Sequence, residues 1–379
     1  MAYESVDALQ KILAQDVFHY TQDAKKAAGR ALGTLVEVIT FYVLKSWGLE
    51  HSIGIERGLA EFGNPEITHN VEYSLHPTLR EFHLAVDLTK RPITSAQIFP
   101  KLLPNFSTND FHRINATLLT RDDILRNACT IAASNNTRLV AVIDTDAEQQ
   151  TRVALIEQFI LPYAIFECKR VGVEEGTRKG PQTIEKAKQG AYVARTVSSL
   201  HKIRTRSGEL RGLIYKGNQI YSKPYAELIA EIIESKNAEL LRDFILTVGV
   251  VSNHGNWFTS ENHNKELKVL AQSYDWLLFL TDEGLAEFIT ELLLKPKPLL
   301  EPARQAFLAS YQSAKKGNRF TKVQMDYQAD QVLQSYFRAN RKRIEKWFNI
   351  IGPKTGSIEL LKKQLTTLRA KNWRKVYGL

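Results

Sequence analysis

The chain has 379 residues, 44% of them hydrophobic and 24% charged, and its net charge is +10. These values are ordinary for a globular protein, so they exclude a disordered chain or a fibre. The length suits one large domain with an appendage, or two domains.

Targeting signals and cysteine patterns point to a cytoplasmic protein. No stretch approaches eighteen consecutive apolar residues, so a membrane span is not expected. The first residues, MAYESVDALQKILAQD, lack the basic and apolar regions of a secretory signal. Two cysteines, Cys129 and Cys168, are too few for a disulfide framework or a four-cysteine zinc site. Reduced thiols in the cytoplasm are therefore expected.

The positive charge is concentrated near the C-terminus. Residues 296–379 contain 18 Lys and Arg but five Asp and Glu, a net charge of +13, so residues 1–295 carry −3. This asymmetry favours an anionic partner, with nucleic acid the first candidate. The alternative is a solvated basic surface that aids solubility.

In the first third of the chain, apolar spacing predicts a helix over 4–16 and a longer one over 23–47, which ends before Gly48. Alternation predicts strands over 51–57 and 71–75, and the pattern at 122–134 predicts a helix. Most of residues 58–137 cannot be assigned, and we treat them as an insertion.

The central part alternates strands and helices. Strands are predicted over 138–143, 163–171, 244–252 and 276–280, and helices over 181–200, 264–273 and 282–294. Residues 147–160 suit either an amphipathic helix or a hairpin strand that starts near 152. The prolines of KPKP at 295–298 mark a boundary, and 299–379 read as helical with a break at 352–356. We therefore expect an α/β or α+β core over 1–295 and a basic helical DNA-binding region over 296–379.

Two charged residues, Glu167 and Lys169, lie in the segment Tyr163–Val171, YAIFECKRV. Side chains alternate along a strand, so both share one face at the end of an apolar strand. Burying charges there is costly, which indicates a function. The Glu-x-Lys spacing alone is not informative, because it recurs at 234–236 and 266–268 in helical stretches. The alternative for this pair is a structural salt bridge.

A second acid is needed for a metal site. Asp144 and Asp146 follow the strand predicted over 138–143, 23 and 21 residues before Glu167. Mg²⁺ typically takes one or two carboxylates with phosphate oxygens and water. Bound there, it would polarise a phosphate and lower the pKa of a water molecule, which Lys169 would orient or help to deprotonate. The alternative is that the aspartates form a turn or a helix cap.

The order of these segments resembles the PD-(D/E)xK nuclease superfamily, in particular type II restriction endonucleases. That family has a helix bearing a glutamate, a strand, a catalytic aspartate, a strand with (D/E)xK, a helix and two further strands. Here GTLVEVITFYVLKSWG places Glu37 in an apolar helix, and Glu167-Cys168-Lys169 matches ExK. The family often has proline before the aspartate, whereas Asp144 and Asp146 follow other residues.

The resemblance covers about residues 27–294 and implies a central mixed sheet flanked by helices. It also implies catalytic roles for Glu37, Asp144, Glu167 and Lys169, and metal-binding roles for Asp144, Asp146 and Glu167. Glu157, ten residues before Glu167, is a further candidate for the second acid. Gln189 and Tyr192, in the helix predicted after ExK, resemble the Gln/Tyr motif of RecB-like nucleases, with shorter spacing. For Glu37 the alternative is an ordinary ion pair.

Three groups of basic residues could contact DNA phosphates. Arg338, Arg341 and Lys342 are spaced to share one helix face, while the aromatic residues around them are expected in the core. The other candidates are Arg178, Lys179 and Lys186 after the ExK strand, and Arg369 and Arg374 near the C-terminus.

The sequence thus predicts a sequence-specific, Mg²⁺-dependent endonuclease for double-stranded DNA. A homodimer is expected if the target is palindromic, and a cognate DNA methyltransferase is expected as a genetic partner of such an enzyme. The alternatives are a RecB-like or repair nuclease of the same fold, a non-catalytic DNA-binding protein and an RNA-binding protein.

Overall fold

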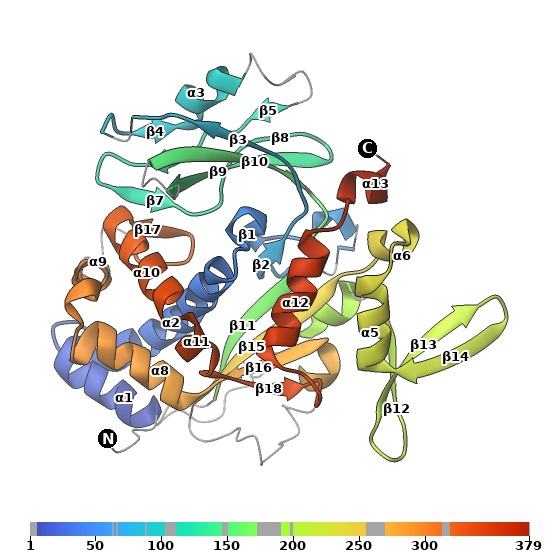
Figure 1. Ribbon diagram of the computed structural model, residues 1–379. Coiled ribbons are helices and arrows are strands. Elements are labelled where there is room, and N and C mark those ends of the chain that lie inside the picture. The colour runs from blue at the N-terminus through green and yellow to red at the C-terminus, as the bar shows by residue number, and fades with distance from the viewer. Residues whose placement is uncertain are drawn as a thin grey trace.

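A six-stranded mixed sheet runs through the middle of the computed structural model, which describes residues 6–62, 64–65, 67–87, 89–102, 111–145, 151–172, 191–197, 200–254, 270–312 and 319–378 (Figure 1). Its strand order is β1-β2-β11-β15-β16-β18. The bounds are β1 Ile53–Arg57, β2 Val71–Leu75, β11 Ala164–Gly172, β15 Leu246–His254, β16 Trp276–Leu280 and β18 Phe348–Gly352. β11, β15 and β16 are parallel, and their neighbours are antiparallel.

Helices cover both faces of this sheet. On one face, Phe166 and Val250 pack in the largest hydrophobic cluster with α2 (Ala24–Ser46), α8 (Asp282–Ile289), α10 (Tyr327–Ala339) and α12 (Ile358–Arg369). On the other face, Ile165 and Val251 pack against the helical residues 191–197 and their surroundings. The predicted mixed α/β class with a mixed sheet flanked by helices is therefore confirmed.

The long helix α2 follows its sequence signals closely. The Asp23 carboxylate caps it by accepting a hydrogen bond from the Lys26 amide at 2.9 Å. After its end the chain turns at Gly48, whose φ of +74° suits a residue without a side chain. By length and composition α2 could cross a membrane, but 78% of its most apolar window is buried inside the protein. It is accordingly a core helix of this fold.

Residues 78–159 lie between β2 and β11 in sequence, and the part of this segment that the structure describes forms a separate layer at the top of Figure 1. One sheet has the order β3-β10-β9-β8-β5, with bounds Thr78–Leu84, Thr151–Phe159, Thr137–Thr145, Cys129–Ala133 and His112–Arg113. A smaller sheet has the order β17-β7-β6-β4, with bounds Gln324–Asp326, Ile124–Arg126, Thr117–Leu119 and Ile93–Thr94, and α3 (Ser95–Ile98) follows β4.

Two expectations for this layer are resolved. The segment after Asp146 contains the hairpin strand β10 instead of an amphipathic helix. The helix predicted over 122–134 is wrong, because β7 and β8 occupy that segment. Asp123 and Ala128 have φ values of +59° and +45°, which a right-handed helix cannot contain. The bounds of the layer also differ from the insertion predicted at about 58–137. Residues 58–77 include β2 of the central sheet, whereas residues 138–159 belong to the layer.

A three-stranded ribbon extends away from the body at the lower right of Figure 1. It consists of β12 (His201–Arg204), β13 (Leu210–Lys216) and β14 (Gln219–Pro224). α5 (Tyr225–Glu234) and α6 (Ala238–Arg242) then lead to β15. At the N-terminus, α1 (Val6–Ile12) continues as a π-helix over Leu13–Val17, in agreement with the helix predicted over 4–16.

The C-terminal segment is part of the core, which differs from the boundary predicted at 295–298. Its helices are α9 (Glu301–Gln312), α10, α11 (Arg341–Glu345), α12 and α13 (Trp373–Tyr377). Its strands join two sheets, since β17 pairs with β7 and β18 pairs with β16. A solvated appendage would not contribute edge strands and buried helix faces, so this segment folds together with the rest.

A buried polar network joins α2 to α10. One carboxylate oxygen of Asp330 accepts hydrogen bonds from the Tyr42 hydroxyl at 2.8 Å and from the Lys45 ammonium at 3.2 Å. The other accepts from the Gln334 amide at 2.5 Å. Asp330 is fully buried and Lys45 is 6% exposed, so each charge depends on the other for compensation.

We expect Asp330→Ala to lower the free energy of unfolding by about 3–5 kcal/mol, because it leaves the Lys45 ammonium buried without its counter-ion. Asp326→Ala is the matched control on the same helix. Asp326 caps α10 at the surface, so its loss should cost about 1 kcal/mol. Urea denaturation measures both values, and equal losses would contradict the role assigned to the network.

Candidate active site

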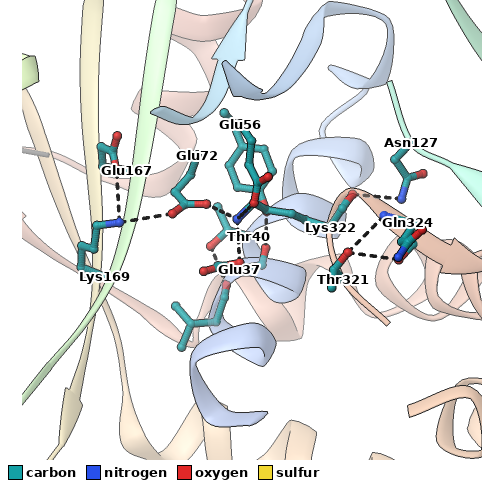
Figure 2. Close-up of polar contacts among 12 residues, drawn as sticks. Glu37, Thr40, Glu56, Glu72, Asn127, Glu167, Lys169, Thr321, Lys322 and Gln324 are labelled. Atoms are coloured by element: carbon teal, nitrogen blue, oxygen red, sulfur yellow. Dashed lines mark hydrogen bonds and ion pairs between the residues drawn. The ribbon is translucent and has the colours of Figure 1, made fainter. Parts of the chain in front are cut away.

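Two glutamates lie where β2 and β11 stop pairing. The antiparallel ladder between these strands runs from the Leu75–Ala164 pair to the Tyr73–Phe166 pair. The next residues along the two strands are Glu72 and Glu167. Figure 2 shows both carboxylates directed toward the Lys169 ammonium between them.

Glu167 is the most unusual of these side chains. Its side chain is 0% exposed, and among the described residues neither carboxylate oxygen has a hydrogen-bond partner. Lys169 Nζ and His69 Nε2 each lie 3.6 Å from Glu167 Oε2. A buried carboxylate that has only such distant partners is expensive to maintain. This position is therefore suited to an additional cation.

Lys169 links the two strands. Its Nζ lies 3.2 Å from Glu72 Oε1, and its side chain is 19% exposed. Burial lowers the pKa of Lys169, but the carboxylates of Glu167 and Glu72 outweigh burial, so the pKa is raised. Lys169 is accordingly an ammonium at neutral pH, a hydrogen-bond donor with a fixed positive charge.

A second lysine, Lys322, lies among three glutamates. Its Nζ is 2.7 Å from Glu37 Oε2 and 3.0 Å from Glu56 Oε1, and it also contacts Glu72 Oε2. The side chain is 4% exposed. Burial lowers its pKa, but Glu37 and Glu72 raise it further than burial lowers it, so Lys322 is charged at neutral pH.

The carboxylates of Glu37 and Glu72 have opposite pKa shifts. Burial raises the pKa of Glu37, and the nearby Glu72 adds to this, although Lys322 opposes it. Burial also raises the pKa of Glu72, but Lys322 and Lys169 outweigh it, so the pKa of Glu72 is lowered. Glu72, which lies between the two ammonium groups, is therefore the more firmly ionised carboxylate.

Mg²⁺ is the divalent ion that the sequence predicts for this cluster. Within the described part of the chain, no three His, Cys, Asp or Glu side chains form a ready metal cage. Mg²⁺ does not require one, because it commonly keeps several waters and uses one or two carboxylates with substrate phosphates. Glu72 and Glu167 supply two carboxylates from adjacent strands, and Glu167 lacks hydrogen bonds. This pair fits such an ion.

The structure does not bring the predicted second acid to this cluster. Asp144 lies on β9 of the five-stranded sheet, opposite Arg152 of β10. Glu157 lies on β10 and forms an ion pair with Arg80 at 2.5 Å. Asp146 lies outside the described residues. Glu72 is the acid that lies next to Glu167 and Lys169, where Asp144, Asp146 or Glu157 was expected. Glu37, which was predicted for the site from its place in the long helix, does lie in the cluster.

The predicted DNA-contacting residues are only partly described. Arg178, Lys179, Lys186 and Gln189 lie outside the described residues. Arg338, Arg341, Lys342, Arg369 and Arg374 are all exposed. Arg338 lies in the last turn of α10 whereas Arg341 begins α11, so the single continuous helix face predicted for them is wrong. The surrounding aromatic residues Tyr336, Phe337, Trp347 and Phe348 are buried as expected, and Tyr192 is 43% exposed.

Three residues of the cluster were missed from the sequence. Glu72 carries a detectable signal, because it is an acid inside the apolar strand VEYSL, as Glu167 is in its own strand. Glu56 and Lys322 carry none. Lys322 lies in the turn before β17, and only the folded chain brings it to residues that precede it by some 250 positions or more.

Comparison of the chain with protein-family models, with curated proteins and with solved structures finds no significant match. The function is therefore inferred from the chemistry of the site.

We expect Glu72→Gln to lower the free energy of unfolding at pH 7 by about 1–3 kcal/mol, because it removes a carboxylate that accepts a hydrogen bond from Lys169 and forms an ion pair with Lys322. A lowered folded-state pKa contributes stability above the unfolded value, near pH 4.3, and this is lost as pH falls through the folded pKa. The difference from the wild type should therefore shrink below about pH 4.

Glu56→Gln is the matched control for this measurement. The Glu56 side chain is 54% exposed, so its ion pair should contribute about 0–1 kcal/mol. Denaturant titrations across pH 3–8 give both curves. A Glu72→Gln deficit that persists unchanged at pH 3 would contradict the charge-based account.

Proposed function

We propose that this protein is a Mg²⁺-dependent endonuclease of the PD-(D/E)xK type that hydrolyses double-stranded DNA. The observation that carries this proposal is Glu167, a fully buried carboxylate that accepts no hydrogen bond from the described residues, beside Lys169 on its own strand and Glu72 on the adjacent strand. A structural ion pair would satisfy its own hydrogen bonds, whereas a site for an incoming cation leaves them open.

The arrangement of elements also supports it. α2 carries Glu37, β2 carries Glu72 and β11 carries Glu167 and Lys169, followed by a helix over 191–197 and the strands β15 and β16. This resembles the family order of helix, acid, (D/E)xK strand, helix and two strands. The chain departs from the family pattern in three ways. The second acid is a glutamate, the residue before it is Val71 where the family often has proline, and the layer over 78–159 separates β2 from β11.

The residues of the site would have different roles in the reaction. Glu72 and Glu167 would hold Mg²⁺, which supplies a Lewis acid for the scissile phosphate and a water of lowered pKa. Lys169, held as an ammonium, would donate hydrogen bonds to the attacking water or to a phosphate oxygen and stabilise charge developing there. Glu37 would shape the site through Lys322.

Site-specific cutting is the form of the activity that we favour. The basic segment 296–379 supplies positive charge for the phosphates, with Arg338, Arg341, Lys342, Arg369 and Arg374 exposed. As a restriction enzyme in the cytoplasm, the protein would form a homodimer at a palindromic target and would have a cognate DNA methyltransferase.

Variants test which acid serves the reaction. We expect Glu72→Gln, Glu167→Gln and Lys169→Ala each to lower plasmid cleavage in Mg²⁺ by about 10²-fold or more. The two glutamine variants lose a carboxylate that would hold Mg²⁺, and the alanine variant loses the ammonium that would stabilise charge on the phosphate. Asp144→Asn should stay within about twofold of the wild type. A large loss in Asp144→Asn with full activity in Glu72→Gln would assign the metal site to the other sheet.

Binding separates a nuclease from a DNA-binding protein. With Ca²⁺ replacing Mg²⁺, Lys169→Ala should retain DNA affinity within about tenfold, because one ion contact is worth about 1 kcal/mol. Gel-shift titrations measure this. A wild-type protein that binds DNA but cuts none with Mg²⁺ or Mn²⁺ would refute the enzymatic proposal.

The pattern of products tests sequence specificity. Digestion of one plasmid of known sequence should give discrete bands with a common sequence at their ends, because base contacts select the site. A smear at every enzyme concentration would instead favour a repair or RecB-like nuclease. Mapping the ends also gives the recognition sequence and the overhang.

A further inference from the structure

Lys322 occupies the position of a cation among carboxylates. An ammonium has three N–H donors, and three carboxylate groups surround this one, from Glu37, Glu56 and Glu72. They come from three elements, α2, β1 and β2. Figure 2 shows the Lys322 side chain extended into this group, next to the Glu72 carboxylate that also contacts Lys169.

The backbone at Lys322 is fixed on both sides. The Thr321 amide donates to the Gln324 carbonyl at 2.8 Å, which closes a tight turn. The Asn127 side chain donates to the Lys322 carbonyl at 3.1 Å, and the Asn127 amide donates to the Val323 carbonyl at 2.9 Å. The fold therefore fixes the backbone that carries this side chain, and the three carboxylates hold its ammonium.

Glu56 is held in a strained conformation that serves this contact. It has a φ of +47°, which non-glycine residues rarely adopt. Its neighbours Ile55 and Arg57 pair with β2, whereas Glu56 is left out of the register. The local distortion lets a strand residue direct its carboxylate to Lys322.

Among the described residues, the cluster contains more carboxylates than ammonium groups. Glu37, Glu56, Glu72 and Glu167 supply four carboxylates, and Lys169 and Lys322 supply two ammonium groups. Without Lys322, the three carboxylates of Glu37, Glu56 and Glu72 would lose the cation that they share.

We propose that Lys322 is a built-in cation that takes the place of a second divalent ion, so that the site holds a single ion at Glu72 and Glu167. This rests on the proposed function for the identity of the ion. Lys322 does not touch the substrate in this role. It is a positioning residue that orients the Glu72 carboxylate through Oε2, and its backbone joins the layer over 78–159 and the C-terminal segment to the site.

The test counts bound ions in the absence of DNA. Isothermal titration calorimetry and electron paramagnetic resonance measure how many Mn²⁺ ions each full-length variant binds. We expect Lys322→Met to bind one more Mn²⁺ than the wild type, because it leaves Glu37, Glu56 and Glu72 without their cation. Lys322→Arg keeps the charge and should bind the wild-type number. An unchanged count in folded Lys322→Met would overturn the proposal.

Two control variants distinguish a change in the number of bound Mn²⁺ ions from a loss of stability. Lys45→Met removes another buried, ion-paired lysine at a distance from the cluster, and it should destabilise the protein without adding an ion. The double variant Lys322→Met/Glu56→Gln removes one charge of each sign, so the cluster keeps its wild-type net charge. It should fold even if the single variant does not, and Glu37 and Glu72 should still admit the additional Mn²⁺. No additional ion in the folded double variant would also overturn the proposal.

The two proposals fail in different ways. A wild type that cuts DNA, together with a Lys322→Met variant that binds no additional ion, would leave the nuclease and remove the role of Lys322. A wild type that cuts no DNA, together with an additional ion in Lys322→Met, would remove the nuclease but leave Lys322 as a resident cation.

Discussion

The compensation of buried carboxylates is the constraint on which the rest of this structure depends. Glu37, Glu72 and Glu167 come from a helix and two strands and lie near each other, with Glu72 and Glu167 buried and Glu37 half-buried. Carboxylates in a low-dielectric environment repel one another and must be paired or neutralised. Lys169 and Lys322 provide part of that neutralisation, and they connect β11 and the C-terminal segment to the same point. The C-terminal segment is thus part of the site through Lys322, and it is part of the core through β18.

The geometry of the central sheet explains why the acids meet there. β2 and β11 pair over only three residues on each strand, and beyond this ladder each strand carries a glutamate. On the other side of β11, Glu167 is opposite Gly249, where a side-chain carbon would approach the Tyr274 ring to 2.7 Å. Tyr274 therefore closes one side of Glu167, and this closure keeps its carboxylate from water. The site therefore lies at the end of the ladder between β2 and β11, where the next residue on each strand is a glutamate.

Much of the fold could be predicted from local patterns, and the site only in part. α2, β2, β11 and β16 have strong apolar periodicity, and their predicted bounds agree with the structure to within about two residues. Glu167 and Lys169 were found because charges inside an apolar strand are costly. Glu72 has the same signal in its own strand, but it is distant from Glu167 in sequence, and only the pairing of β2 with β11 brings the two together. The layer over 78–159 separates β2 from β11 in sequence and conceals their pairing. No local pattern could indicate Lys322, because its role depends on contacts between distant segments.

The two lysines of the cluster differ in the way that decides their roles. Lys169 is 19% exposed and has Glu72 at 3.2 Å and Glu167 at 3.6 Å, so it has access to solvent and incomplete hydrogen bonding. Lys322 is 4% exposed, and three carboxylates match its three donors. A donor that must stabilise charge on a phosphate needs a free N–H and a route to the substrate, which Lys169 has and Lys322 lacks. The same cluster therefore contains one cation suited to act on the substrate and one suited to hold the acids in place.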